Sequence, residues 1–201
     1  MSGDHDDDAL RVGVKDEIRA RRRALRRALP ADARERRSAA IAERVHSLDE
    51  WQSAETILAF ISMRTEVQTR ALVELAWNEK KRVAAPRMSA ERDDLTLREW
   101  REGDELEESG MMFLQPLTSA APVAEETIAL VLVPALAVDD RGQRIGYGKG
   151  FYDRLLPRLV GATRVAVVFD FERIAEVPNR AGDQPVDVIV TDARVVRTGA
   201  R

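Results

Sequence analysis

Apolar side chains recur at helical spacing in the first quarter of the chain and predict two amphipathic helices. The first covers residues 11–29 and the second covers residues 31–48. Pro30 lies between them and ends or kinks the first helix. We therefore expect an N-terminal helical hairpin. The apolar stripes are Val14, Ile18, Leu25 and Leu29 in the first helix and Ile41, Val45 and Leu48 in the second.

After residue 55 the pattern changes to short apolar runs. Residues 56–62 and 81–86 are predicted strands, and residues 69–80 between them are a predicted amphipathic helix, which implies a right-handed parallel crossover. Residues 101–127 are polar and form a long excursion. The pattern predicts an α/β fold with a largely parallel central sheet flanked by helices in a Rossmann-like, three-layer arrangement. Further strands are expected at residues 94–100, 128–138, 163–170 and 185–192.

The amino-acid composition excludes several kinds of site but does not identify the reaction or ligand. The chain has 201 residues, a net charge of −3 and no cysteine, so disulfides, thiolate zinc sites and a cysteine nucleophile are excluded. No apolar run is long enough to span a membrane, and the acidic start is unlike a secretory signal. We expect a disordered leader at residues 1–10, a single domain over residues 11–201 and a cytoplasmic location.

The stretch RIGYGKGFYD, residues 144–153, carries the clearest chemical signal. Its spacing fits neither a Walker A loop nor the dinucleotide fingerprint. Bare glycines nevertheless let backbone N–H groups approach a phosphate, Lys149 can neutralise phosphate charge, and Asp153 can ligate Mg²⁺. An ordinary glycine-rich turn before a helix is the simpler alternative. The position after the most apolar strand favours a ligand site, because ligands of parallel sheets bind beyond the carboxyl ends of the strands.

A basic segment at residues 11–29 offers further cations, with eight basic and two acidic side chains. Lys15 and Arg19 are one helical turn apart and could contact the phosphates of a nucleotide together. The alternatives are a solvated helix face or a surface for RNA or anionic membranes. No aromatic residue is interleaved with the arginines, which argues against single-stranded RNA.

Two more segments contain candidate site residues. Glu66 follows a predicted strand and could accept hydrogen bonds from a heterocycle, with Ile61 and Met63 lining an apolar slot. Asp183 lies in a loop rich in glycine and proline and could be a second Mg²⁺ ligand. A plain loop and a turn-forming aspartate are the alternatives.

Taken in order, these segments resemble the 5-formyltetrahydrofolate cyclo-ligase family. The resemblance runs from about Lys15 to Val196 and is most specific in LVPALAVDDRGQRIGYGKGFYDRLL. It implies an enzyme that uses ATP and Mg²⁺ to convert 5-formyltetrahydrofolate to 5,10-methenyltetrahydrofolate, with release of ADP and phosphate. It further implies a small-molecule substrate, no nucleic-acid or membrane partner, and a monomer.

The same resemblance implies roles for individual residues. Lys149 and Arg144 would be catalytic, and Asp153 and Asp183 would ligate Mg²⁺. The expected ATP contacts are Lys15, Arg19, Arg144, Gly146, Tyr147, Gly148, Lys149, Gly150, Phe151 and Tyr152. The expected folate contacts are Ile61, Met63, Glu66, Tyr147, Gly148, Lys149, Gly150 and Phe151.

One segment departs from the family pattern. Many members carry Glu-x-His-Asp where this chain has Arg180, Ala181, Gly182 and Asp183, so only the final aspartate matches. A non-catalytic relative that binds folate or nucleotide is therefore the alternative function.

Overall fold

The protein was analysed as a computed structural model that describes residues 3–91, 93–111 and 113–200, with side chains described from residue 11 onward. Five α-helices and two short 3-10 helices surround the strands in the described chain. The helices are α1 (Gly3–Ala28), α2 (Ala31–His46), α3 (Asp49–Ser53), α4 (Arg70–Asn78), α5 (Phe151–Leu155), η1 (Glu125–Thr127) and η2 (Asp170–Glu172).

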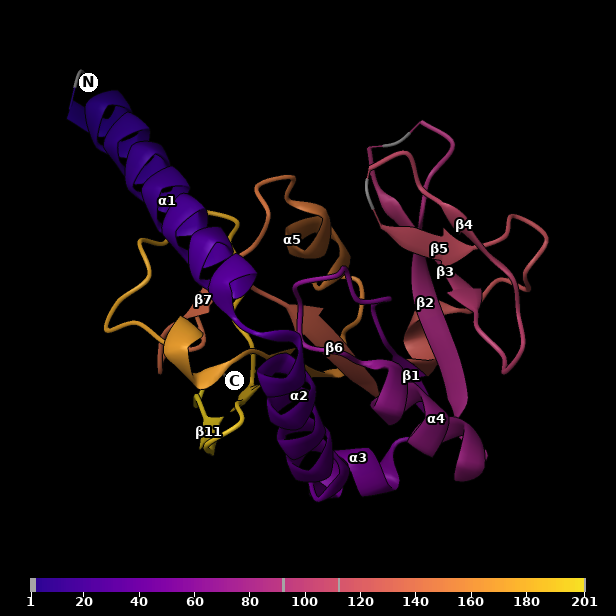
Figure 1. Cartoon of the computed structure of the whole chain (residues 1–201). Coiled ribbons are helices and arrows are strands. Elements are labelled where there is room, and N and C mark those ends of the chain that lie inside the picture. Colours follow the sequence, from indigo (N-terminus) through magenta and orange to yellow (C-terminus); the bar gives the residue numbers. More distant parts are fainter. Residues whose placement is uncertain (1–2, 92, 112, 201) are drawn as a thin grey trace.

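A seven-stranded sheet forms the centre of the molecule (Figure 1). Its strand order is β11-β10-β9-β6-β1-β2-β3, and the five inner strands run parallel. The two edge strands, β3 and β11, pair antiparallel to their neighbours. These strands are β1 (Thr56–Leu58), β2 (Arg82–Met88), β3 (Leu95–Glu99), β6 (Leu130–Pro134), β9 (Thr163–Val167), β10 (Val188–Val190) and β11 (Val195–Arg197).

Two small hairpins accompany the central sheet. Strands β4 (Leu106–Glu108) and β5 (Leu114–Pro116) form one within residues 101–127, the segment expected to be a long excursion. Strands β7 (Ala137–Val138) and β8 (Arg144–Ile145) form the other. The predicted strand 128–138 is therefore two strands, because Pro134 ends β6 and the chain then leaves the sheet to pair with β8.

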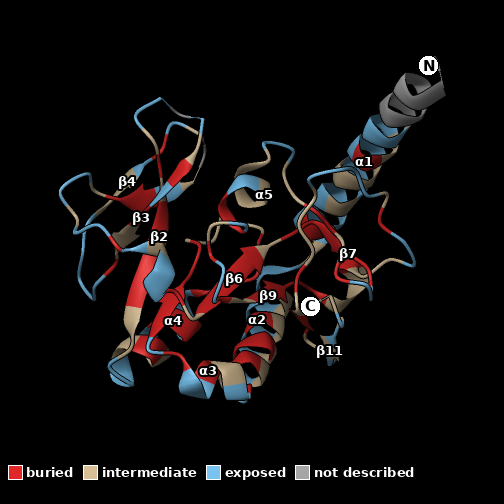
Figure 2. Cartoon of the chain, turned by 180° about the vertical axis from the view of Figure 1, so that it is seen from behind, coloured by how far each residue is buried: buried red, intermediate tan, exposed pale blue. Residues whose placement is uncertain are grey.

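Alternate residues of the inner strands pack into two separate cores, which gives the predicted three layers. Ile57, Leu130 and Leu132 face the core beneath α2, α3 and α4. Leu58 and Val131 face the opposite core, which α5 helps to cover. In Figure 2 the buried residues accordingly concentrate along the sheet and the inner faces of these helices. The α/β class and the largely parallel sheet are confirmed.

The two predicted N-terminal helices are both present but begin and end differently from expectation. Helix α1 begins at Gly3, inside the segment predicted to be a disordered leader, and ends at Ala28. Residues 1–2 and the side chains of residues 3–10 lie outside the described part, so the leader stays a prediction. Pro30, with φ −56° and ψ 149°, caps α2 and turns the chain between the helices. Figure 1 shows α1 reaching across the sheet end near β7.

Candidate active site

A cavity of about 920 Å³ opens beyond the carboxyl ends of β1 and β6. These two strands are neighbours, yet the chain leaves β1 toward β2 on one side and leaves β6 toward β9 on the other. Such a switch point is where α/β sheets bind ligands. Every site residue singled out from the sequence lines this cavity, including the members from α1, from the segment after β1 and from the glycine loop.

The glycine loop, residues 146–150, joins β8 to α5 along one wall of the cavity. Gly148 and Gly150 have φ values of +96° and +69°, in the left-handed region that other residues rarely adopt. A Cβ atom on Gly148 would lie 3.5 Å from Cζ of Arg19. The loop therefore needs glycine for its backbone path. The helix after it, α5, is short and covers Phe151–Leu155.

Both predicted metal ligands pair with basic side chains in this structure. Lys15 Nζ donates to Asp183 Oδ2 at 2.5 Å, and Arg144 donates to Asp153 Oδ1 at 2.8 Å. Backbone N–H groups also donate to these carboxylates, from Gln184 to Asp153 at 3.1 Å and from residue 180 to Asp183 at 2.7 Å. The contacts bring residues from α1, β8, α5 and the loop after η2 to one end of the cavity.

The other basic side chains of the site differ in how many of their hydrogen-bond donors already have a partner. Arg19 Nε donates to the Gly146 carbonyl at 3.0 Å, so Arg19 supports the glycine loop from α1. The Arg144 side chain is 4% exposed, and within the described chain its Nε atom has no hydrogen-bond partner. Lys149 is exposed, and no carboxylate of the described residues forms an ion pair with it. Arg144 and Lys149 therefore retain donors for an anionic ligand.

Glu66 lies buried at the other end of the cavity and is 3% exposed. Its Oε1 atom accepts a hydrogen bond from Tyr147 Oη at 2.7 Å, and its Oε2 atom accepts one from the Met63 backbone N–H at 2.8 Å. Burial raises the pKa of Glu66 above its usual value, and the nearby Arg26 guanidinium opposes that shift. Glu66 is thus a fixed acceptor within a largely desolvated wall.

A buried arginine beneath this carboxylate escaped the sequence analysis. Arg26 of α1 is 2% exposed and forms an ion pair with Glu172 of η2. Its NH1 atom also donates to Tyr147 Oη at 2.7 Å. The sequence offered little signal for this cluster, because Arg26 is one of eight basic residues in its segment and Glu172 lies 146 positions away.

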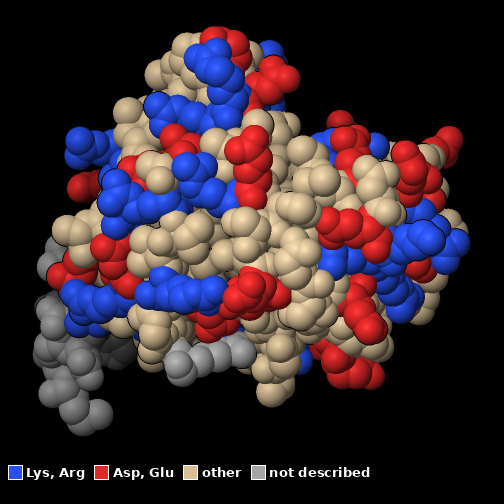
Figure 3. All heavy atoms as spheres, turned by 90° about the horizontal axis from the view of Figure 1, so that it is seen from below, with Lys and Arg blue, Asp and Glu red and all other residues tan. Residues whose placement is uncertain are grey.

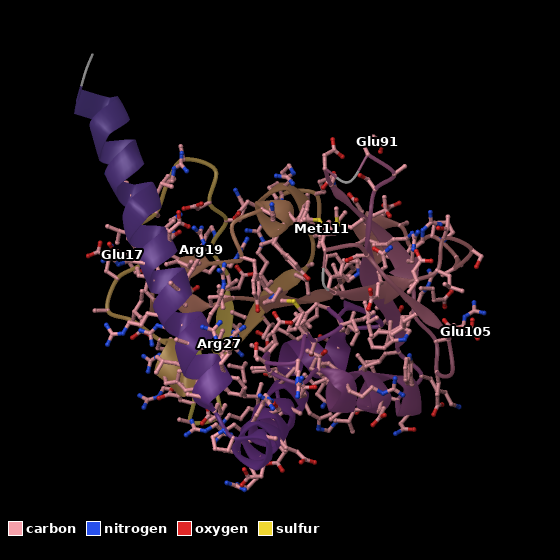
Figure 4. All side chains as sticks on the ribbon, turned by 45° about the horizontal axis from the view of Figure 1, so that its top comes forward. Glu17, Arg19, Arg27, Glu91, Glu105 and Met111 are labelled. Atoms are coloured by element: carbon pink, nitrogen blue, oxygen red, sulfur yellow. The ribbon has the colours of Figure 1, made fainter. Side chains whose placement is uncertain are left out.

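The remaining walls of the cavity are largely apolar. Side chains from the ends of β1 and β3 and from the β4–β5 connection contribute to them, and Figure 4 shows Arg19 on α1 and Met111 on opposite sides of this space. An apolar slot between charged ends suits a flat heterocycle with polar substituents. The apolar lining residues include Phe60, Ile61, Met63, Leu95, Met111, Phe113 and Leu136.

Three features of the described residues bear on other classes of function. No group of three or more His, Cys, Asp or Glu side chains among them is arranged to hold a metal ion. None of the described helices combines the length and apolarity required to cross a bilayer. On the face in Figure 3, basic and acidic side chains are interspersed, so this face lacks the continuous basic stripe typical of nucleic-acid binding.

Comparison with known proteins identifies the family. The model of the 5-formyltetrahydrofolate cyclo-ligase family matches residues 11–192. The chain belongs to this family. A cyclo-ligase from Mus musculus is 27% identical over 186 residues, covering 86% of this chain and 91% of the relative. The cyclo-ligase from Escherichia coli K12 is also 27% identical, over 177 residues that cover 86% of this chain and 97% of the relative.

The fold agrees with a solved structure of the same family. The 5,10-methenyltetrahydrofolate synthetase from Aquifex aeolicus superposes with a TM-score of 0.81 at 28% sequence identity. The superposition covers 92% of this chain and 93% of that protein. The cyclo-ligase fold therefore extends over nearly the whole chain.

Proposed function

We propose that this protein converts 5-formyltetrahydrofolate to 5,10-methenyltetrahydrofolate, consuming ATP in the presence of Mg²⁺ and releasing ADP and phosphate. The names of its relatives supply the substrate and the product. One structural observation supports the proposal most strongly. A single cavity holds a glycine loop and several basic side chains at one end and a buried carboxylate beside an apolar slot at the other. Two dissimilar ligands, a triphosphate and a pterin, could thus meet between them.

At the nucleotide end, Arg144 and Lys149 would contact phosphate oxygens, since both retain donors in the described structure. Lys15 and Arg19 would join them from α1. Asp153 and Asp183 fit Mg²⁺, because this ion prefers oxygen ligands and commonly takes one or two carboxylates together with substrate phosphates. When bound, the ion would neutralise phosphate charge.

Binding of ATP and Mg²⁺ would require the charged side chains of the site to exchange their present partners for the ligands. Lys15 and Arg144 now neutralise Asp183 and Asp153. A triphosphate would draw these cations away from the carboxylates, which would then be available to the ion. Nucleotide and Mg²⁺ should therefore each bind more tightly in the presence of the other.

The chemistry needs no nucleophile from the protein. The formyl oxygen would attack the γ-phosphorus of ATP, forming an O–P bond as the bond to ADP breaks. Folate N10 would then attack the activated carbon and lose its proton, and the C–O bond would break to release phosphate. Holding both ligands in line can contribute roughly 7–11 kcal/mol of barrier reduction. Lys149 and Arg144 would stabilise charge on the transferred group.

At the folate end, we assign Glu66 to the N–H groups of the pterin. Its two oxygens are already oriented by Tyr147 and the Met63 backbone, so the remaining lone pairs have fixed directions. Ile61 and Met63 would contact the ring faces.

The decisive experiment incubates the protein with 5-formyltetrahydrofolate, ATP and Mg²⁺ and follows the near-ultraviolet absorbance of the methenyl product. Omitting ATP should abolish the signal, and Lys149→Ala should lower the rate with little change in melting temperature. No product from folded wild-type protein, with both ligands bound, would instead favour the non-catalytic alternative. That alternative is motivated by the altered residues 180–182 beside Asp183. We further propose that the protein acts as a monomer in the cytoplasm.

A further inference from the structure

Arg26 is a buried cation, and each of its three nitrogen atoms donates at least one hydrogen bond. Its Nε and NH2 atoms donate to the two carboxylate oxygens of Glu172, and NH2 also donates to the Ala135 carbonyl. The NH1 atom donates to Tyr147 Oη at 2.7 Å. The pairing with Glu172 fixes the guanidinium plane, because a bidentate arginine–carboxylate contact has a defined geometry.

This fixed donor determines what Tyr147 can do. A phenol has one proton, so the hydroxyl that accepts a hydrogen bond from Arg26 must direct its own proton elsewhere. The partner in reach is Glu66 Oε1, at 2.7 Å. Arg26, Tyr147 and Glu66 therefore form a chain of hydrogen bonds with one direction, leading from α1 to the wall of the cavity.

The charges of this cluster do not balance. One guanidinium faces two buried carboxylates, with Glu172 in direct contact and Glu66 at 3.9 Å. Burial raises the pKa of both carboxyl groups, and Arg26 opposes the shift in each. Glu172 has the closer ionic contact, so Glu66 is the less compensated of the two.

We propose that Arg26 is a positioning residue for the reaction, which acts through the Tyr147 hydroxyl to orient Glu66 and keep it ionised for the folate. The inference rests on the proposed function, since it takes Glu66 as the folate contact. Arg26 itself would not need to touch the substrate. A purely structural ion pair would affect only the stability of the fold. A positioning role for Arg26 would also affect the affinity for the folate and the pH dependence of turnover.

Among the described residues, four ionisable groups interact electrostatically with Glu66 and set the signs of the expected pH shifts. They are Arg26 from α1, Tyr147 from the glycine loop, Tyr152 from α5 and Glu172 from η2. Removing the Tyr147 donor or the Arg26 charge leaves Glu66 less stabilised as a carboxylate. Removing the Glu172 charge has the opposite effect, because Arg26 is then balanced mainly by Glu66.

The test compares Tyr147→Phe, Arg26→Met and Glu172→Gln with wild type. The measurements are KM for 5-formyltetrahydrofolate, KM for ATP, and the pH profile of turnover. Tyr147→Phe and Arg26→Met should raise the folate KM about tenfold or more, as expected for loss of a hydrogen bond to a charged group. The ATP KM should change less, and the acid limb of the profile should move to higher pH. Glu172→Gln should move that limb to lower pH.

Arg22→Met is the matched control. Arg22 lies one turn before Arg26 on α1 and donates to the Phe171 carbonyl, outside the chain of hydrogen bonds to Glu66. The Arg22→Met variant should be less stable than wild type, with an unchanged KM for 5-formyltetrahydrofolate and an unchanged pH profile of turnover. If Arg26→Met does not fold, Tyr147→Phe decides, because it removes one hydroxyl and leaves the ion pair intact.

The outcomes separate this inference from the proposed function. Active wild-type protein whose folate KM and pH profile are unchanged in Tyr147→Phe overturns the role of Arg26 and leaves the function standing. Equal shifts in the Arg22 control would also overturn it, since the effect would then be structural. Wild-type protein that neither binds nor converts the folate overturns both.

Discussion

Replacing Gly148 by alanine separates the backbone requirement of the glycine loop from its role at the ligand. At φ +96° an alanine suffers the steric penalty of the left-handed region, roughly 1–2 kcal/mol. In a chain of this length each kcal/mol lowers the melting temperature by roughly 2–4 °C, so a fall of about 2–8 °C is expected. Thermal unfolding measures it directly.

The same substitution should also affect the nucleotide. The new methyl group would lie 3.5 Å from Cζ of Arg19 and 3.6 Å from its Nε, an ordinary contact that requires no movement of the arginine. It would, however, cover part of the guanidinium that we assign to phosphate. Weakening one charged hydrogen bond should raise the KM for ATP about tenfold.

Gly103→Ala provides the control. Gly103 has φ +83°, a methyl group added to it would meet no heavy atom of the described chain within 4 Å, and it does not line the cavity. The Gly103→Ala variant should lose about as much stability as Gly148→Ala, but its KM for ATP should be unchanged. A Gly148→Ala enzyme with wild-type KM, or an equal rise in KM for Gly103→Ala, would refute the assignment of the loop to the nucleotide.

Three further substitutions test other parts of the molecule. Asp153→Asn should raise the Mg²⁺ concentration needed for half-maximal turnover about tenfold or more, measured by metal titration, whereas an unchanged requirement would argue against this ligand. Glu66→Gln should weaken folate binding yet raise the melting temperature at pH 7. Burial raises the pKa of Glu66 in the folded protein. Wild type therefore loses stability as pH rises from the pKa of the unfolded chain, about 4.3, through the pKa of the folded protein, and the glutamine variant does not. A Gln variant with the wild-type pH dependence of stability would contradict this. Gly13→Ala, in the interior of α1 with open space around it, should add roughly 0.5–1 kcal/mol of stability by thermal unfolding, without affecting turnover.

Much of the fold could be predicted because the inner strands are short, continuous runs of apolar residues that can be recognised in the sequence. The apolar run LVLVP reads as a strand buried on both faces, and that is its position in the sheet. The location of the glycine loop at the strand ends also follows from the general rule for parallel sheets. The β4–β5 hairpin was missed, since strands of three residues are too short to show a period that distinguishes a strand from a loop.

The contacts within the site could not be predicted. Lys15 and Asp183 were each singled out, but their ion pair joins positions 168 residues apart and depends on how α1 crosses the sheet. Arg26 and Glu172 look like surface charges in the sequence, and only the fold buries them together. The roles of the individual site residues stay predictions until the variants above are measured.

Helix α1 also carries a constraint on sequence length. Lys15, Arg19 and Arg26 are spaced by one turn and then by about two, so they project from nearly the same side over roughly 16 Å of helix axis. One residue inserted between Arg19 and Arg26 would rotate them apart by about 100°. The site therefore fixes the number of residues between Lys15 and Arg26, because any insertion or deletion there would turn these basic side chains toward different sides of the helix.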